Sequence, residues 1–203
     1  MFRVNPMNFV NRKQVRRRVS QLRRDNPDLT NRELCDLIIK QKCLKCAAAG
    51  TVTALPAAVP GLGTVLALLG GTFLDISAIS YFMSEMILEM AVVYERDPSM
   101  SRVSKEAVWV FASAVGSNKF GRNISQASMR TMNNQVMVKM LQDIFRSLGI
   151  RATQRSVVRI IPLLGAGICG GVNYLVCRKV GRMAADYYES NQEHKWKGVT
   201  IDV

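Results

Sequence analysis

The hydrophobic and polar positions of this 203-residue chain follow a helical period over most of its length. Apolar residues recur at three- and four-residue intervals after residue 30 and again between residues 123 and 148, which is typical of amphipathic helices. Residues 153–161 fit a helix or a strand equally well, and no βαβ alternation occurs. The sequence therefore predicts an all-α domain of about six or seven helices, with helices 64–97 and 163–189 at its centre.

The stretch that organises this pattern is residues 47–74, which carry no charge. Its length exceeds the roughly 20 residues that cross a bilayer, but a Pro/Gly corner around Pro60 interrupts it. Asp75 follows within the next apolar run, and a buried carboxylate needs a partner, for which Arg159 and Arg178 are the candidates. We therefore expect a chain that lies against a membrane and does not cross it, with a membrane-embedded hairpin as the alternative.

Residues 1–28 form a basic arm. Val15, Val19 and Leu22 fall at helical spacing, and the first 24 residues contain eight Arg or Lys and no acid. Such a helix can dock on anionic lipid or another acidic surface, or it can simply pack on the domain as a solvated charged helix. The side chains expected to bind anions are Arg12, Lys13, Arg16, Arg17, Arg18, Arg23 and Arg24.

The formal net charge of +13 favours anionic partners: a membrane surface, an acidic protein or nucleic acid. Nucleic acid is disfavoured, because few aromatic residues interleave the basic arm and no nucleic-acid-reading motif is recognisable. An odd number of cysteines indicates a reducing compartment, cytoplasmic or mitochondrial. Cys35, Cys43 and Cys46 lack the fourth soft ligand of a structural zinc site, so we expect no metal and no cofactor.

Glycines near the C-terminus spell Gly-x-Gly-x-x-Gly, the dinucleotide-binding fingerprint. The context is wrong, because Pro162 interrupts any preceding strand and no second strand follows. We instead expect these glycines to form a small-residue helix face for close packing. The glycines concerned are Gly165, Gly167, Gly170 and Gly171.

Three carboxylates, Asp75, Glu85 and Glu89, are the candidates for catalysis. Glu85 and Glu89 are four residues apart on one helical face, and either a metal or solvent can lie opposite them. No Glu-x-x-His accompanies them, and no nucleophile–base–acid set is visible. An enzyme is therefore the least favoured class.

Two segments resemble the EcsC family. The first combines Ala47-Ala48-Ala49-Gly50 and Leu55-Pro56 with a long helix that ends in Ala91-Val92-Val93-Tyr94-Glu95-Arg96-Asp97-Pro98. The second runs from Ile161-Pro162 through Gly165-Ala166 and Asn173-Tyr174 to Tyr187-Tyr188. Glu95 stands where the family commonly has Gly. The resemblance implies an all-helical, often membrane-associated domain that bacteria link to an ABC exporter, with no catalytic residues to carry over.

These patterns divide the chain into a basic arm (1–28), an EcsC-like helical domain (29–190) and a polar tail (191–203). The expected function is that of a non-enzymatic, membrane-associated helical protein, an accessory subunit or scaffold of a membrane complex. The alternative is a soluble helical module that binds acidic protein or nucleic acid. The residues expected to be structural are Asp75, Pro60, Gly165, Gly167, Gly170, Gly171 and Asn173.

Overall fold

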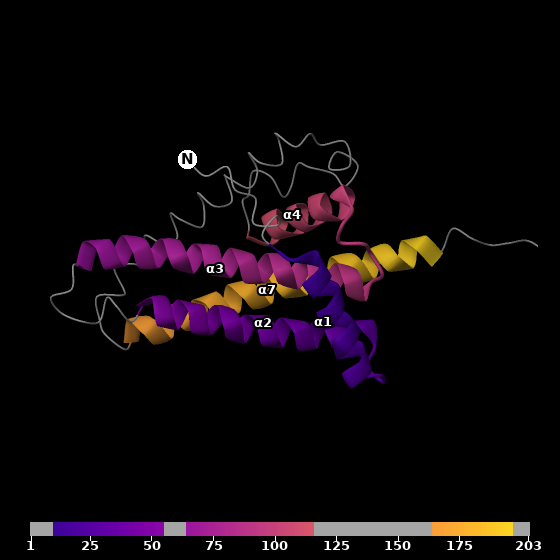
Figure 1. Cartoon of the computed structure of the whole chain (residues 1–203), viewed down its shortest axis with the longest axis horizontal. Coiled ribbons are helices and arrows are strands. Elements are labelled where there is room, and N and C mark those ends of the chain that lie inside the picture. Colours follow the sequence, from indigo (N-terminus) through magenta and orange to yellow (C-terminus); the bar gives the residue numbers. More distant parts are fainter. Residues whose placement is uncertain (1–9, 55–63, 116–163, 197–203) are drawn as a thin grey trace, which may run out of the picture.

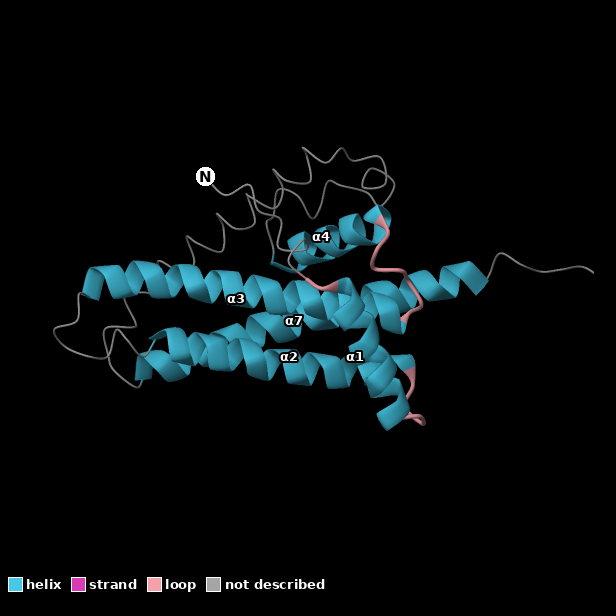
Figure 2. Ribbon diagram, viewed as in Figure 1, coloured by secondary structure: helices cyan, strands magenta, loops and turns pink. Residues whose placement is uncertain are grey.

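The computed structural model describes residues 10–54, 64–115 and 164–196, and side chains within 10–52, 77–100, 102–111 and 170–191. The regular secondary structure of this part is all helix, joined by loops and turns, and it contains no strand (Figure 2). Its five helices are α1 (Arg12–Asp25), α2 (Asn31–Ala54), α3 (Thr64–Val93), α4 (Ser101–Val115) and α7 (Leu164–Trp196). The all-α prediction is confirmed. The total of six or seven helices depends on residues outside this part and stays a prediction.

Helices α2, α3 and α7 lie side by side as the long axis of the molecule, and α4 packs on α3 and α7 (Figure 1). Helix α1 crosses one end of this group and packs on α3. The core between the helices is built from buried apolar side chains, among them Leu34 and Ile38 of α2, Met86 of α3 and Val180 of α7. Helices α3 and α7 cover most of residues 64–97 and 163–189, and the place of these two helices at the centre of the whole domain stays a prediction.

Helix α2 begins at a capping box, which the sequence Thr30-Asn31-Arg32-Glu33 predicts. The backbone N–H of Thr30 donates to Glu33 Oε2 at 2.8 Å, and the N–H of Glu33 donates to Thr30 Oγ1 at 3.3 Å. These two bonds satisfy donors that the helix itself leaves without a partner. The hydrogen bond to the Thr30 backbone also lowers the pKa of Glu33.

The pairing of α2 with α7 is antiparallel and close. Arg32 near the start of α2 forms ion pairs with Asp186 at 2.6 Å and Glu189 at 2.9 Å near the end of α7. At the other end, a Cβ added to Gly170 would lie 2.5 Å from Thr51 Oγ1. Gly170 therefore allows the two helix backbones to approach, which confirms its packing role.

The other glycine predictions have mixed outcomes. Gly171 is exposed and an added Cβ would meet nothing within 4 Å, so its predicted packing role is wrong: it lies on the solvent side of α7. Gly165 and Gly167 lie in the first turn of α7, but what packs on them is outside the described residues. Gly181, which the glycine pattern does not single out, packs so tightly that a Cβ would lie 2.6 Å from Ile39 Cγ1.

The dinucleotide fingerprint lies inside α7, which begins at Leu164. A phosphate-binding glycine run forms a loop before a helix, so this helical run does not have the geometry of such a site. Asn173 is buried, with 3% of its surface exposed, as expected of a structural residue. Pro60 and the side chain of Asp75 lie outside the described residues. Arg178 is exposed and is therefore not half of the buried ion pair considered for Asp75.

Helix α3 ends in a Schellman motif. The Arg96 N–H donates to Ala91 O at 2.8 Å, and the Glu95 N–H donates to Val92 O at 3.0 Å. Glu95 adopts a φ of 59°, in the left-handed region that glycine favours. Beyond the cap, Arg96 forms an ion pair with Glu106 of α4 at 2.7 Å and lies over the ring of Tyr188 of α7. The end of α3 thereby joins α4 and α7.

Two helix bounds differ from the sequence interpretation. Helix α3 stops at Val93, four residues before the expected end at Asp97, because the Schellman motif closes it first. Helix α7 continues to Trp196, into the segment expected to be a polar tail. No helix among the described residues combines the length and apolar composition needed to cross a bilayer.

Candidate functional site: a basic helix over a buried charge cluster

Within the basic arm, α1 (Arg12–Asp25) is a helix, as predicted, and its apolar stripe faces the protein. Asn11 caps α1, because its side chain accepts hydrogen bonds from the backbone N–H groups of Lys13 and Gln14. Val15 and Val19 are buried, with 0% and 2% of their surfaces exposed, because α1 packs this stripe on α3. The stripe is therefore not free to enter a membrane while α1 stays docked.

Four arginines of α1 form contacts within the chain. Arg12 donates to Ser99 O at 3.0 Å, and Arg16 forms an ion pair with Asp97 in the α3–α4 connection. Arg23 donates to Val93 O at 2.6 Å, at the end of α3. Hydrogen bonds from the Ser99 backbone and from Arg16 lower the pKa of Asp97. These contacts, together with those of Arg18, attach α1 along its length.

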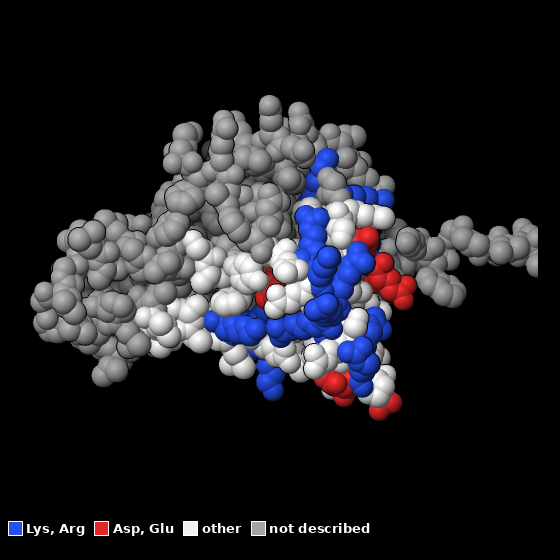
Figure 3. Space-filling view, viewed as in Figure 1, with Lys and Arg blue, Asp and Glu red and all other residues white. Residues whose placement is uncertain are grey.

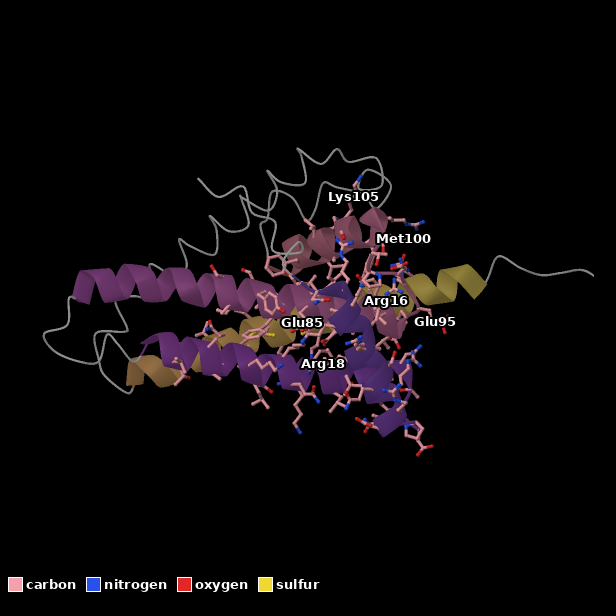
Figure 4. The ribbon with its side chains drawn as sticks, viewed as in Figure 1. Arg16, Arg18, Glu85, Glu95, Met100 and Lys105 are labelled. Atoms are coloured by element: carbon pink, nitrogen blue, oxygen red, sulfur yellow. The ribbon has the colours of Figure 1, made fainter. Side chains whose placement is uncertain are left out.

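Arg18 reaches a cluster of charges buried beneath α1. Lys42 of α2 is fully buried and forms ion pairs with Glu85 and, at 2.8 Å, with Glu89 Oε1, both on α3. Arg18 Nε lies 3.3 Å from the same Glu89 oxygen and Arg18 also donates to Gln41 of α2 at 2.6 Å. Figure 4 shows Arg18 and Glu85 in this crossing region. The cluster thus joins α1, α2 and α3.

The electrostatics of the cluster are those of a desolvated ion network. Burial raises the pKa of Glu89, and the neighbouring Lys42 and Arg18 oppose this shift without cancelling it. Neither Glu89 oxygen has a well-directed hydrogen bond, so Lys42 stabilises this carboxylate mainly as a nearby charge. A buried network of this kind is costly to break, because removing one charge leaves the others unpaired.

The sequence did not decide whether a metal or solvent lies opposite the two glutamates of α3. The arrangement of the cluster shows what lies there. Glu85 and Glu89 face Lys42, and within the described residues no group of three His, Cys, Asp or Glu is placed to hold a metal ion. A lysine that forms ion pairs with two carboxylates neutralises the negative charge that would otherwise attract a metal cation. The role that this cluster supports is the attachment of α1 to α2 and α3.

Lys42 is the residue that sequence reasoning missed. A signal was present, since Lys42 follows Ile38 by four residues and precedes Cys46 by four, on the buried face of α2. A lysine within an apolar stripe implies a carboxylate partner on another helix. Glu85 and Glu89, the four-residue pair on α3, were that partner.

Cysteine side chains gather on the buried face between α2 and α7. Cys35, Cys43, Cys46 and Cys177 are free and buried, and Cys177 Sγ lies 4.0 Å from Met86 Sδ. Burial raises the pKa of the Cys35 thiol to about 12. Hydrogen bonding to Cys177 and burial raise the pKa of Cys43. Buried thiols are shielded from reagents, so these four are core residues.

The outward face of α1 is basic. Lys13, Arg17 and Arg24 are exposed and have no ion-pair partner among the described residues. With Arg16, Ser20 and Gln21, Arg17 and Arg24 line a shallow, open depression. In Figure 3, a band of Lys and Arg side chains crosses the molecule over α1 and continues along α2. Of the seven basic residues predicted to bind anions, these three are thus the ones available to a partner.

No family model, curated protein or solved structure matches the chain. The resemblance to the EcsC family therefore rests on the motifs quoted above.

Proposed function

We propose that this chain is a non-enzymatic peripheral protein of anionic membrane surfaces that binds through the outward face of α1, as an accessory subunit or scaffold of a membrane complex. The observation that carries the proposal is a set of three exposed cations on one helix face, Lys13, Arg17 and Arg24, which have no ion-pair partner among the described residues. Each Lys or Arg near an anionic bilayer contributes roughly 1 kcal/mol. Three such residues support reversible, salt-sensitive binding.

The packing of α1 on the protein supports a contact in which this helix lies on the membrane surface and does not insert into the bilayer. Its valines pack on α3, and Arg12, Arg16, Arg18 and Arg23 point to partners in the protein. The helix therefore presents charge while keeping its apolar stripe covered. The EcsC-like motifs point the same way, because that family is often membrane-associated.

The experiment is co-sedimentation with vesicles of phosphatidylcholine alone or mixed with phosphatidylserine, over a series of salt concentrations. We expect binding only to the anionic vesicles, falling with salt as screening increases. Changing Lys13, Arg17 and Arg24 to Gln removes three charges and should weaken binding roughly hundredfold, at about 1 kcal/mol for each charge.

The matched control keeps the charges and changes the side chains: Lys13→Arg, Arg17→Lys and Arg24→Lys. It should bind as the wild type does, because the contact is electrostatic. Equal binding of the Gln variant, or equal binding to neutral vesicles, would refute the proposal. Deletion of residues 1–24 is a poorer test, because it also uncovers the α3 surface and the buried cluster. Tighter binding of the wild type to single-stranded RNA than to vesicles would favour the soluble alternative.

A further inference from the structure

A row of exposed side chains runs along α2. Every fourth residue from Asp36 through Lys40, Leu44 and Ala48 to Val52 is exposed. Leu44 exposes 57% of its surface and Val52 exposes 63%, and on α7 Leu175 exposes 62%. Burying exposed apolar side chains is favourable, so each of these three favours contact with an apolar partner.

The antiparallel register brings Leu44 and Leu175 to the same level of the helix pair. Cys43 and Cys177 contact each other, and Gly170 lies against Ala47 and Thr51. Leu44 is next to Cys43 in the sequence, and Leu175 is two residues before Cys177. Both are exposed, so both lie away from the buried contact between α2 and α7. We call Leu44, Ala48, Val52, Gly171 and Leu175 the outer ridge.

Cations surround the outer ridge. On α2 and α7, the exposed basic residues without an ion-pair partner in the described part of the chain are Lys40, Lys45, Arg178, Lys179 and Arg182. Arg178 is near enough to α2 to lower the pKa of Cys43. The nearby acids lie toward the far end of the pair, and Arg32 pairs with the two on α7; they are Glu33 and Asp36 on α2, and Asp186 and Glu189 on α7.

The outer ridge also borders α1. Gln41 of α2, between Lys40 and Leu44, accepts the hydrogen bond from Arg18 of α1. The ridge is therefore flanked by the basic face of α1 on one side and by the basic residues of α7 on the other. Its charge excludes a second copy of this chain as the best-fitting partner, because two such cationic faces repel each other.

From this geometry we infer that the outer ridge inserts Leu44, Val52 and Leu175 into the headgroup region of an anionic bilayer, so that α2 is the helix nearest the membrane. The inference deepens the proposed function and rests on it. Apolar side chains at the centre with Lys and Arg at the rim match an interface where acyl chains lie beneath anionic headgroups. Nucleic acid would leave the leucines without an apolar contact, and no described exposed residue of the ridge is aromatic.

The test uses the full chain with one tryptophan added at a time, Leu44→Trp or Leu175→Trp. Its fluorescence is measured as the difference from the wild type, on phosphatidylserine-containing vesicles with and without brominated acyl chains. The control is Met100→Trp, another exposed apolar position, which Figure 4 places beside α4 on the side of α3 opposite α2. We expect brominated lipid to quench the tryptophans at 44 and 175 and to leave the one at 100 unquenched.

A second measurement removes the apolar surface and keeps every charge. Leu44→Ser with Leu175→Ser should lower binding to anionic vesicles about tenfold at high salt, where the electrostatic contribution is screened, and less at low salt. Both leucines are exposed, so the variant should fold normally, which circular dichroism verifies.

The outcomes separate the two proposals. If binding depends on the α1 charges but the tryptophans at positions 44 and 175 are not quenched, the inference about the outer ridge is overturned and the proposed function stands. Absence of vesicle binding by the wild type would overturn both. Dimerisation of the wild type that is lost in the double Ser variant would assign the ridge to a second copy and overturn the inference.

Discussion

Glu95 is the one residue other than glycine among the described residues with a positive φ, at 59°. Its Cβ is crowded by the backbone in this conformation, which costs roughly 1–2 kcal/mol for a residue with a side chain. The resemblance to the EcsC family noted a Gly at this place, and the Schellman motif gives the physical reason a Gly is suited to it.

Glu95→Gly should therefore raise the free energy of unfolding by about 1 kcal/mol, measured by urea denaturation. Glu95→Ala is the matched control, because it removes the carboxylate and keeps the Cβ. The Ala variant should gain little. If Ala stabilises as much as Gly, the cost at this position comes from the charge near the helix end and not from the backbone.

Gly170 and Gly171 are neighbours with opposite surroundings. Gly170→Ala places a Cβ against Thr51 and Ala47, and overpacking of this kind costs about 1–3 kcal/mol. Gly171→Ala meets nothing within 4 Å and should stabilise α7 by up to about 1 kcal/mol through helix propensity. Thermal unfolding of the two variants measures the difference. Equal effects would show that α7 does not pack on α2 through Gly170.

At the scale of elements, the buried charge cluster decides how α1, α2 and α3 are joined. Lys42→Met should lower the free energy of unfolding by roughly 3–5 kcal/mol, because Glu85 and Glu89 are left as unpaired buried charges. The triple variant Lys42→Met, Glu85→Leu and Glu89→Leu should recover most of the loss. A cost below about 1 kcal/mol for Lys42→Met would mean that water reaches the cluster.

Local patterns predicted the helices well where the signals were local. The Thr30–Glu33 capping box marked the start of α2, and the spacing of Val15 and Val19 marked the buried side of α1. The cluster was beyond such patterns, because Lys42 and Glu85 are 43 residues apart and each looks like an ordinary charged residue in its own helix. Its prediction needed the pairing of two helices, which periodicity alone does not provide.

At the scale of the whole molecule, the same limit applies to surfaces. Net charge pointed to an anionic partner, but it did not tell which arginines are already engaged within the protein. Nor did the sequence distinguish Leu44 and Leu175 from core leucines, because exposure follows from the α2–α7 register. The membrane hypothesis was available from composition, whereas the orientation now proposed required the three-dimensional arrangement.

The same α2–α7 pairing has a consequence for how the chain is made. Arg32 and its partner Asp186 are 154 residues apart. At the usual 5–20 residues per second of synthesis, α2 waits about 8 to 30 seconds for α7 to be translated. Until then the side of α2 that ends up against α7, with Ile39 and Cys43, has no partner helix to cover it. The helix that we place nearest the membrane is thus one of the first to be made and one of the last to be enclosed.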